Sequence, residues 1–107
     1  MPDVFAAVAS PARRRLLDLL RDRGPLPVQD LASHFAMARP SVSEHLKVLK
    51  DAGLVAERKS GRHRYYHVEP ELLRELADWL TPYERFWRQK LASLRALLDG
   101  QDETGPP

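Results

Sequence analysis

The sequence of 107 residues contains no cysteine. This absence excludes disulfides, thiolate metal sites and thiol-based redox sensing together. It also fits a reducing cytoplasm, and we expect a cytoplasmic protein. No run of about eighteen apolar residues occurs, so no transmembrane helix is expected. At the N-terminus the arginines of residues 13–15 follow the apolar stretch, the reverse of a secretory signal.

Signatures of catalysis are also missing. We find no nucleophile paired with a base, no glycine-rich loop of the kind that holds phosphate, and no residues with metal-ligand spacing. The chain is long enough for one small domain with one core. We therefore expect a small non-enzymatic domain without a cofactor or metal.

Charge is unevenly distributed, although the formal net charge is only +2. Residues 1–38 carry five basic and four acidic groups, residues 39–67 carry seven and three, and residues 68–107 carry five and eight, which gives +1, +4 and −3. Three of the four histidines also lie in the middle third. A basic block of this kind indicates a polyanion as partner, although a solvated surface has the same composition.

Hydrophobic periodicity and capping signals predict a helix-rich fold. We expect a short helix over residues 3–9, a second from Pro11 to Gly24, a third from Pro27, and a fourth that Gly53 ends. In the fourth helix three apolar residues recur at helical spacing and should face inward, namely Val42, Leu46 and Leu49.

A change of period after Gly53 predicts a β-hairpin. Two short segments rich in strand formers, residues 54–59 and 64–68, flank the turn signal Ser60-Gly61. Two helices joined by a tight connection and followed by a hairpin make a winged helix-turn-helix. The expected fold is thus mainly α with a small β-hairpin wing, and with dimerisation helices at its N- and C-terminal ends.

The C-terminal part predicts two helices with a break between them. Thr81 as N-cap, Pro82 at the first helical position and Glu84 two residues later read as a capping box. A new helix is expected from Pro82 to about Leu98, with Gly100 stopping it. Residues 1–99 would then form one DNA-binding and dimerisation domain, and residues 100–107 a disordered tail.

Aromatic and leucine side chains form a wide stripe on this last helix. Such a stripe favours a symmetric dimer interface over ordinary intrachain packing, because interface cores are enriched in Trp, Tyr and Phe. The candidate dimer residues, two of them on the first helix, are Phe5, Val8, Tyr83, Phe86, Trp87, Leu91, Leu94 and Leu98. A small apolar effector among these aromatics stays open, and nothing in the sequence establishes one.

The order of these elements resembles the ArsR-type bacterial transcriptional repressors. The resemblance rests on SPARRRLLDLL, on VQDLASHFAMARPSVSEHLKVLKDAGLV and on the wing ERKSGRHRYYHV, and it covers roughly Val4 to Leu98. It implies a dimeric regulator that binds double-stranded DNA, with its second motif helix in the major groove. The candidate DNA-binding residues are Arg39, Ser41, Ser43, Glu44 and Lys47 on that helix and Arg58, Lys59, Arg62, His63 and Arg64 in the wing.

The outer face of the fourth helix has chemistry that suits base edges and phosphates. Serine hydroxyls donate or accept, Glu44 can accept from a cytosine amine, and Lys47 can bind guanine or phosphate. Ala38 offers no side-chain cap, so a backbone phosphate is expected to satisfy the first amides of the helix. His45 adjoins the inward face, and we expect it to be a half-buried, hydrogen-bonded support.

Metal sensing is not expected. Thiolate sensors of the resembled family carry Cys-x-Cys in the third helix, where residues 27–31 have no cysteine, and others use histidine in the last helix, where residues 83–99 have none. The stretch WLTPYERFWRQKL resembles a metal-independent branch, in which some members repress their own operon. We therefore expect a homodimeric repressor with an operator near its own promoter. The alternative is a protein-interaction module that docks through its C-terminal aromatic helix without specific DNA binding.

Overall fold

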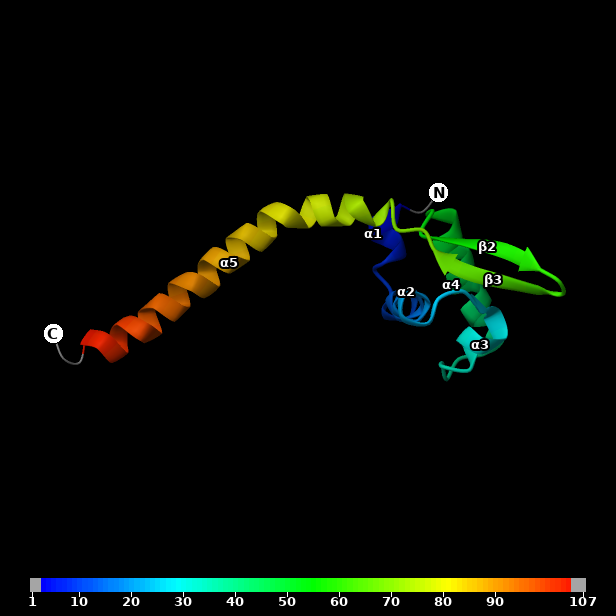
Figure 1. The fold of residues 1–107 in the computed structure, drawn as a ribbon, viewed down its shortest axis with the longest axis horizontal. Helices are drawn as coiled ribbons and strands as arrows, with labels where there is room; N and C mark the ends of the chain where they lie inside the picture. Colours follow the sequence, from blue (N-terminus) through cyan, green and yellow to red (C-terminus); the bar gives the residue numbers. More distant parts are fainter. Residues whose placement is uncertain (1–2, 105–107) are drawn as a thin grey trace. The chain divides into compact units, whose positions relative to one another are not determined.

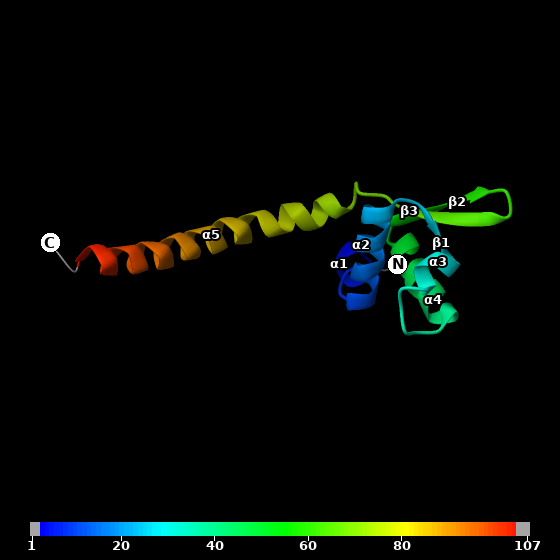
Figure 2. The ribbon, with the colours of Figure 1, turned by 60° about the horizontal axis from the view of Figure 1, so that its bottom comes forward.

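The computed structural model describes residues 3–104, with the side chains of residues 3–100, and it divides the chain into residues 1–76 and residues 77–107. Each of these two units is described by itself. The elements in chain order (Figures 1 and 2) are α1 (Val4–Ala7), α2 (Pro11–Arg23), β1 (Leu26–Pro27), α3 (Val28–Ala32), α4 (Arg39–Asp51), β2 (Val55–Ser60), β3 (His63–Val68) and α5 (Leu73–Thr104).

The first two helices begin at side-chain caps. Asp3 Oδ1 accepts from the amide of Ala6 at 2.7 Å, and Ser10 Oγ accepts from the amide of Arg13 at 3.3 Å. Pro11 occupies the first turn of α2, where its missing N–H is not needed. Gly24, with φ of 79°, ends α2. The predicted start and end of this helix are therefore confirmed.

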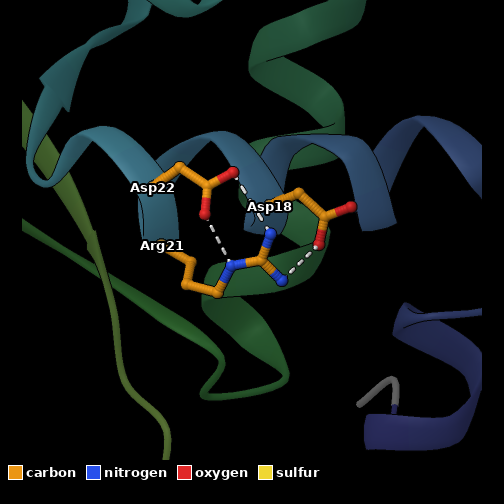
Figure 3. Close-up of polar contacts among 3 residues, drawn as sticks. All are labelled: Asp18, Arg21 and Asp22. Carbon is orange, nitrogen blue, oxygen red and sulfur yellow. Dashed lines mark hydrogen bonds and ion pairs between the residues drawn. The ribbon is translucent and has the colours of Figure 1, made fainter.

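An exposed ion-pair cluster neutralises one arginine in the last turn of α2 (Figure 3). Arg21 Nε donates to Asp22 Oδ1 at 2.8 Å, and Arg21 Nη1 donates to Asp18 Oδ1 at 3.4 Å. The hydrogen bond from Arg21 lowers the pKa of Asp22 and raises the pKa of Arg21. Since two carboxylates offset this guanidinium, Arg21 adds nothing to the basic surface of the chain.

The helix-turn-helix pair is formed by α3 and α4. Ala52 and Gly53 close α4 in a Schellman motif, because the amide of Leu54 donates to the Leu49 carbonyl at 2.9 Å and the amide of Gly53 to the Lys50 carbonyl at 2.9 Å. Gly53 has φ of 81°, and a Cβ there would lie 2.6 Å from Cδ1 of Leu72. The positive φ therefore favours glycine, as expected for the residue that ends the helix, whereas the exposed Leu72 side chain could shift to make room for a Cβ.

The wing is a three-stranded antiparallel sheet in the order β1-β3-β2. The predicted hairpin is confirmed as β2 and β3, with Gly61 at φ of 63° in the turn. The strand β1 was not expected, and it pairs Leu26 with Tyr66 and Pro27 with Tyr65. A strand of two residues that ends in proline has no sequence pattern of its own, so only its pairing with β3 defines it.

One apolar core holds these elements of the first unit together. Its buried side chains come from α1, α2, α3 and α4, from the connection after α4 and from the start of β2. The largest fully buried ones are Leu16, Leu31, Leu46, Leu49, Leu54 and Val42. Leu73 and Leu76, in the first turns of α5, pack against this core. The three residues predicted to face inward from α4 are each 1% exposed or less, which confirms the register of that helix.

Two expectations for the C-terminal part are wrong. Helix α5 runs through Pro82 without a break and continues past Gly100 to Thr104. Thr81 is no N-cap, because its Oγ1 donates to the Ala77 carbonyl one turn back at 2.8 Å. The φ of proline is helical, so a helix can continue through it at the loss of one backbone hydrogen bond. Of the expected tail at residues 100–107, the last three residues lie outside the described part of the chain.

Candidate nucleic-acid interface

Helix α4 separates into a buried face and an exposed polar face. With Val42, Leu46 and Leu49 fixed in the core, the side chains of Ser41, Ser43, Glu44 and Lys47 are exposed. Within residues 3–104 these four side chains make no hydrogen bond or ion pair with another residue. The structure thus presents all four predicted residues of this face without internal partners.

The N-terminus of α4 offers fewer amides than expected. Ala38 provides no side-chain cap, as predicted. However, Pro40 has no N–H, and the amides of Ser41 and Val42 donate to the Ala38 carbonyl at 2.9 and 3.2 Å. The Val42 bond is the regular first bond of the helix, so the expectation of free first amides is wrong for Ser41, whose amide is satisfied within the turn.

The five basic wing residues divide between the two faces of the hairpin. Residues that pair directly across antiparallel strands lie on the same face of a sheet. Lys59 pairs with Arg64, and this pair lies on the same face of the hairpin as the pair of Glu57 and Tyr66. The Tyr66 side chain packs on the core. Arg58 pairs with Tyr65 on the opposite face, where Ser60 pairs with His63. The sequence showed a continuous basic turn, whereas the strand pairing sends its side chains in two directions.

A concave site of about 240 Å³ joins α4 to the wing. Three arginines and a histidine from distant parts of the chain line it, although strand pairing turns the side chain of His63 toward the other face. They come from the first residue of α4 and from the turn and start of β3, and the polar lining residues are Gln29, Arg39, Arg62, His63, Arg64 and Tyr66. Arg39 thereby lines the same hollow as Arg62 and Arg64, and no spacing in the sequence predicts that grouping. Gln29 and Tyr66 were missed, since they carry no motif.

A second hollow lies on the other face of the wing. It has a volume of about 330 Å³ and is lined by Pro25, Arg58, Ser60, Tyr65 and His67. His67 Nε2 lies 2.9 Å from Oε1 of Glu69, so an acidic group adjoins this side of the wing. Arg58 is therefore separated from Arg62 and Arg64, with which the sequence grouped it.

Glu57 links α4 to the wing at the base of the hairpin. Lys50 Nζ donates to Glu57 Oε1 at 2.7 Å, and Arg64 Nη1 lies 3.9 Å from the same oxygen. The hydrogen bond from Lys50 lowers the pKa of Glu57 below its ordinary value of 4.5, and the same bond raises the pKa of Lys50. Burial raises the pKa of Tyr66, which adjoins this carboxylate. Lys50 is thus engaged within the chain, and Arg64 lies within ion-pair distance of the same carboxylate.

Replacing Glu57 by glutamine is expected to lower the free energy of unfolding by about 0.2–1 kcal/mol at pH 7, the usual range for an exposed ion pair. Because folding lowers the pKa of Glu57, its stabilisation is present above pH 4.5 and is lost as the pH falls through the folded value. Urea denaturation of both proteins from pH 7 to pH 3 should show the difference shrinking in acid. Glu44→Gln is the control, and an equal, pH-independent loss in both variants would contradict the assignment.

The arginines of residues 13–15 make contacts within the chain, although Arg14 and Arg15 are exposed. Arg14 Nη1 donates to the Val8 carbonyl at 2.8 Å, and the guanidinium of Arg15 lies 5.2 Å from the centre of the Phe35 ring. Arg13 Nη1 lies 3.2 Å from Nδ1 of His45. His45 is half-buried, so the expectation of a hydrogen-bonded support on α4 is confirmed, with a partner that sequence reasoning did not find.

The candidate dimer residues lie in both units. In the first unit Phe5 is 39% exposed on α1, while Val8 is half-buried against the core. In the second unit, the single helix from residue 77 onward exposes the remainder: Tyr83 56%, Phe86 58%, Trp87 62%, Leu91 46%, Leu94 55% and Leu98 55%. Apart from the adjacent Phe86 and Trp87, these positions recur every three or four residues, so they share one broad face of α5.

Within residues 3–104 no group of three or more His, Cys, Asp or Glu side chains is arranged to hold a metal ion. None of the helices in that range is long and apolar enough to span a membrane.

Comparison with known proteins places the chain in a family. A family model described as bacterial regulatory protein, arsR family, matches residues 10–57. The chain is 36% identical over 83 residues to the transcriptional repressor SdpR of Bacillus subtilis, covering 78% of this chain and 91% of that protein. It is 39% identical over 103 residues to the HTH-type transcriptional regulator Rv2034 of Mycobacterium tuberculosis, covering 95% and 92%.

A solved structure of similar fold is also a winged helix-turn-helix domain. The homodimeric winged helix-turn-helix DNA-binding domain Mb0332 from Mycobacterium bovis, a possible ArsR-family transcriptional regulator, matches with a TM-score of 0.59 and 30% identity. The match covers 73% of this chain and 72% of that one. The predicted winged helix-turn-helix fold is confirmed, and the chain belongs to the arsR family of bacterial regulatory proteins.

Proposed function

We propose that this ArsR-family regulator is a homodimeric repressor that occupies an operator near its own promoter. The family is one of DNA-binding regulators, so it favours this function over a protein-interaction module and over catalysis. Two of its relatives are named as a transcriptional repressor and as a homodimeric DNA-binding domain. The absence of metal sensing stays a prediction, and the question of an effector stays open.

The observation that carries the proposal is the combination of a polar reading face with a basic hollow beside it. Ser41, Ser43, Glu44 and Lys47 project from α4 without internal partners among the described residues. At the N-terminal end of the same helix, Arg39 shares the 240 Å³ hollow with Arg62 and Arg64 of the wing. A duplex that lies along α4 would bring a phosphate strand to these guanidinium groups.

The two parts of this surface have different chemistry and therefore different roles. Arginine forks match phosphate oxygens, and phosphate contacts position a protein on DNA without reading sequence. Serine, glutamate and lysine on a helix in the major groove can reach base edges, which differ for every base pair. We assign the hollow to the backbone and the exposed face of α4 to base recognition.

The exposed apolar face of α5 supports the dimer. Its aromatic and leucine side chains belong to a unit that consists of one helix and has no core of its own. An apolar stripe of this length on a soluble helix is expected to be covered by another surface. A second copy of the chain would supply an identical stripe, and a two-fold dimer would present two α4 helices to half-sites about one DNA turn apart.

The double variant Ser43→Ala with Lys47→Ala is expected to reduce the preference for operator over unrelated DNA by about tenfold or more, because base contacts contribute roughly 1–3 kcal/mol each. Arg62→Ala should instead weaken binding to all DNA by a similar factor and reduce the salt dependence by about one phosphate contact. Fluorescence anisotropy at several salt concentrations measures both quantities. The operator is taken from genomic fragments selected by the purified protein and then footprinted.

Three results would contradict this proposal in whole or in part. Selection that recovers no preferred fragment would remove sequence-specific recognition altogether. An unchanged footprint and unchanged preference in the Ser43 and Lys47 double variant would remove α4 as the reading face. Recovery of fragments far from the chain's own gene would leave the DNA reader in place but exclude repression of its own promoter.

A further inference from the structure

Arg13 joins the N-terminal helix to the candidate reading helix. Its Nε donates to the Ala7 carbonyl at 2.6 Å and its Nη2 to the Ala6 carbonyl at 3.2 Å. Its remaining nitrogen, Nη1, lies 3.2 Å from Nδ1 of His45, 32 positions further along the chain. One half-buried guanidinium therefore holds the end of α1 and the middle of α4 at the same time.

The chemistry of this contact defines its direction. A guanidinium has only donors, so Nδ1 of His45 must accept the hydrogen bond and carries no proton of its own. The planar guanidinium of arginine can donate hydrogen bonds to acceptors in two directions with a fixed geometry, which a lysine ammonium cannot do. The orientation of the His45 ring is thus tied to the position of the α1 carbonyls.

His45 stands between the two faces of α4. It follows Glu44 on the exposed face and precedes Leu46, which is 0% exposed in the core. Ser41 lies one turn before it on the exposed side. Because the core side of α4 is held by apolar packing alone, Arg13 adds a directional contact beside the reading face.

We propose that Arg13 is a positioning residue that couples α1 to the DNA-reading helix α4. The inference rests on the proposed function and extends it to the control of that surface. Phe5 and Val8, two candidate dimer contacts, belong to α1 and the residue directly after it. Formation of the dimer would therefore act on α4 through Arg13 and His45, in addition to bringing two half-sites together.

Arg14 provides a matched control for this proposal. It carries the same charge and donates to a carbonyl at the end of α1, that of Val8, but makes no hydrogen bond to α4 among the described residues. Arg13→Ala is expected to reduce the preference for operator over unrelated DNA by about fivefold to tenfold, whereas Arg14→Ala should leave that ratio unchanged. Thermal unfolding followed by circular dichroism shows whether each variant remains folded.

Variants of His45 test the contact itself. His45→Asn retains an acceptor near the position of Nδ1 and should keep most of the operator preference, whereas His45→Leu should lose it as Arg13→Ala does. Combining Arg13→Ala with His45→Leu should add no further loss, because both remove the same contact. Additive losses, or equal effects of Arg13→Ala and Arg14→Ala, would overturn the coupling. Loss of preference already in the unmodified protein would overturn the proposed function instead.

Discussion

Replacing Leu46 by alanine is expected to destabilise the first unit by about 2–5 kcal/mol, the largest stability change in this set. Leu46 is 0% exposed on the inner face of α4 and belongs to the central core. Its removal leaves a cavity that neighbouring elements can fill only in part. Small domains have a total free energy of unfolding of about 5–15 kcal/mol, so this one substitution removes a large part of the stability.

Urea denaturation followed by far-UV circular dichroism, at one fixed protein concentration, measures this loss. Glu44→Ala is the matched control, because it lies two positions away on the exposed face of the same helix. A surface substitution of this kind is expected to change stability by no more than about 0.5 kcal/mol. Comparable losses in both variants would show that the two faces of α4 are assigned wrongly.

Introducing aspartate at Trp87 and Leu94 together is expected to convert the dimer to a monomer and to weaken operator binding by about a hundredfold or more. The two side chains lie on one face of α5, seven residues apart, and are 62% and 55% exposed. Each carboxylate would have to lose water at the proposed interface without a cationic partner. A monomer then binds one half-site alone and loses the gain of about 10²–10⁴ that linked sites provide.

A second pair of aspartate substitutions is the control that distinguishes the effect of added negative charge from the effect of disrupting the interface. Gln89→Asp with Ala96→Asp has the same spacing and the same change in net charge, but lies about 200° around the helix from the apolar stripe. Sedimentation equilibrium and anisotropy with operator DNA should show a dimer with nearly normal binding for this control. A dimer that survives Trp87→Asp with Leu94→Asp, or an unmodified protein that is monomeric while binding the operator, would contradict the proposed interface.

Local signals in the sequence were sufficient for the elements that positioned the candidate site. Ser10 marks the start of α2 and Gly24 marks its end. Both ends are predictable, because a capping hydroxyl and a tolerance of positive φ are properties of single residues. Val42, Leu46 and Leu49 gave the register of α4, because helical spacing alone decides which face can be buried. The hairpin followed from a glycine turn between two runs of strand formers.

Local signals failed where the same residues fit two different structures. Thr81, Pro82 and Glu84 satisfy the pattern of a capping box, yet α5 continues through them. The same residues can serve a helix interior, since Thr81 donates to the Ala77 carbonyl and proline has a helical φ. Which outcome is adopted depends on the whole helix, and the sequence pattern describes only four residues.

The sequence by itself determined the winged helix-turn-helix, its inner face and the set of polar residues left outside. Only the tertiary structure decided which of those residues act together. It placed Arg39 at one hollow with Arg62 and Arg64, separated Arg58 onto the other wing face, and joined Arg13 to His45. The physical reason is that periodicity and capping arise from neighbours along the chain. These groupings instead bring together residues 23–32 positions apart, and their meeting depends on how the core packs.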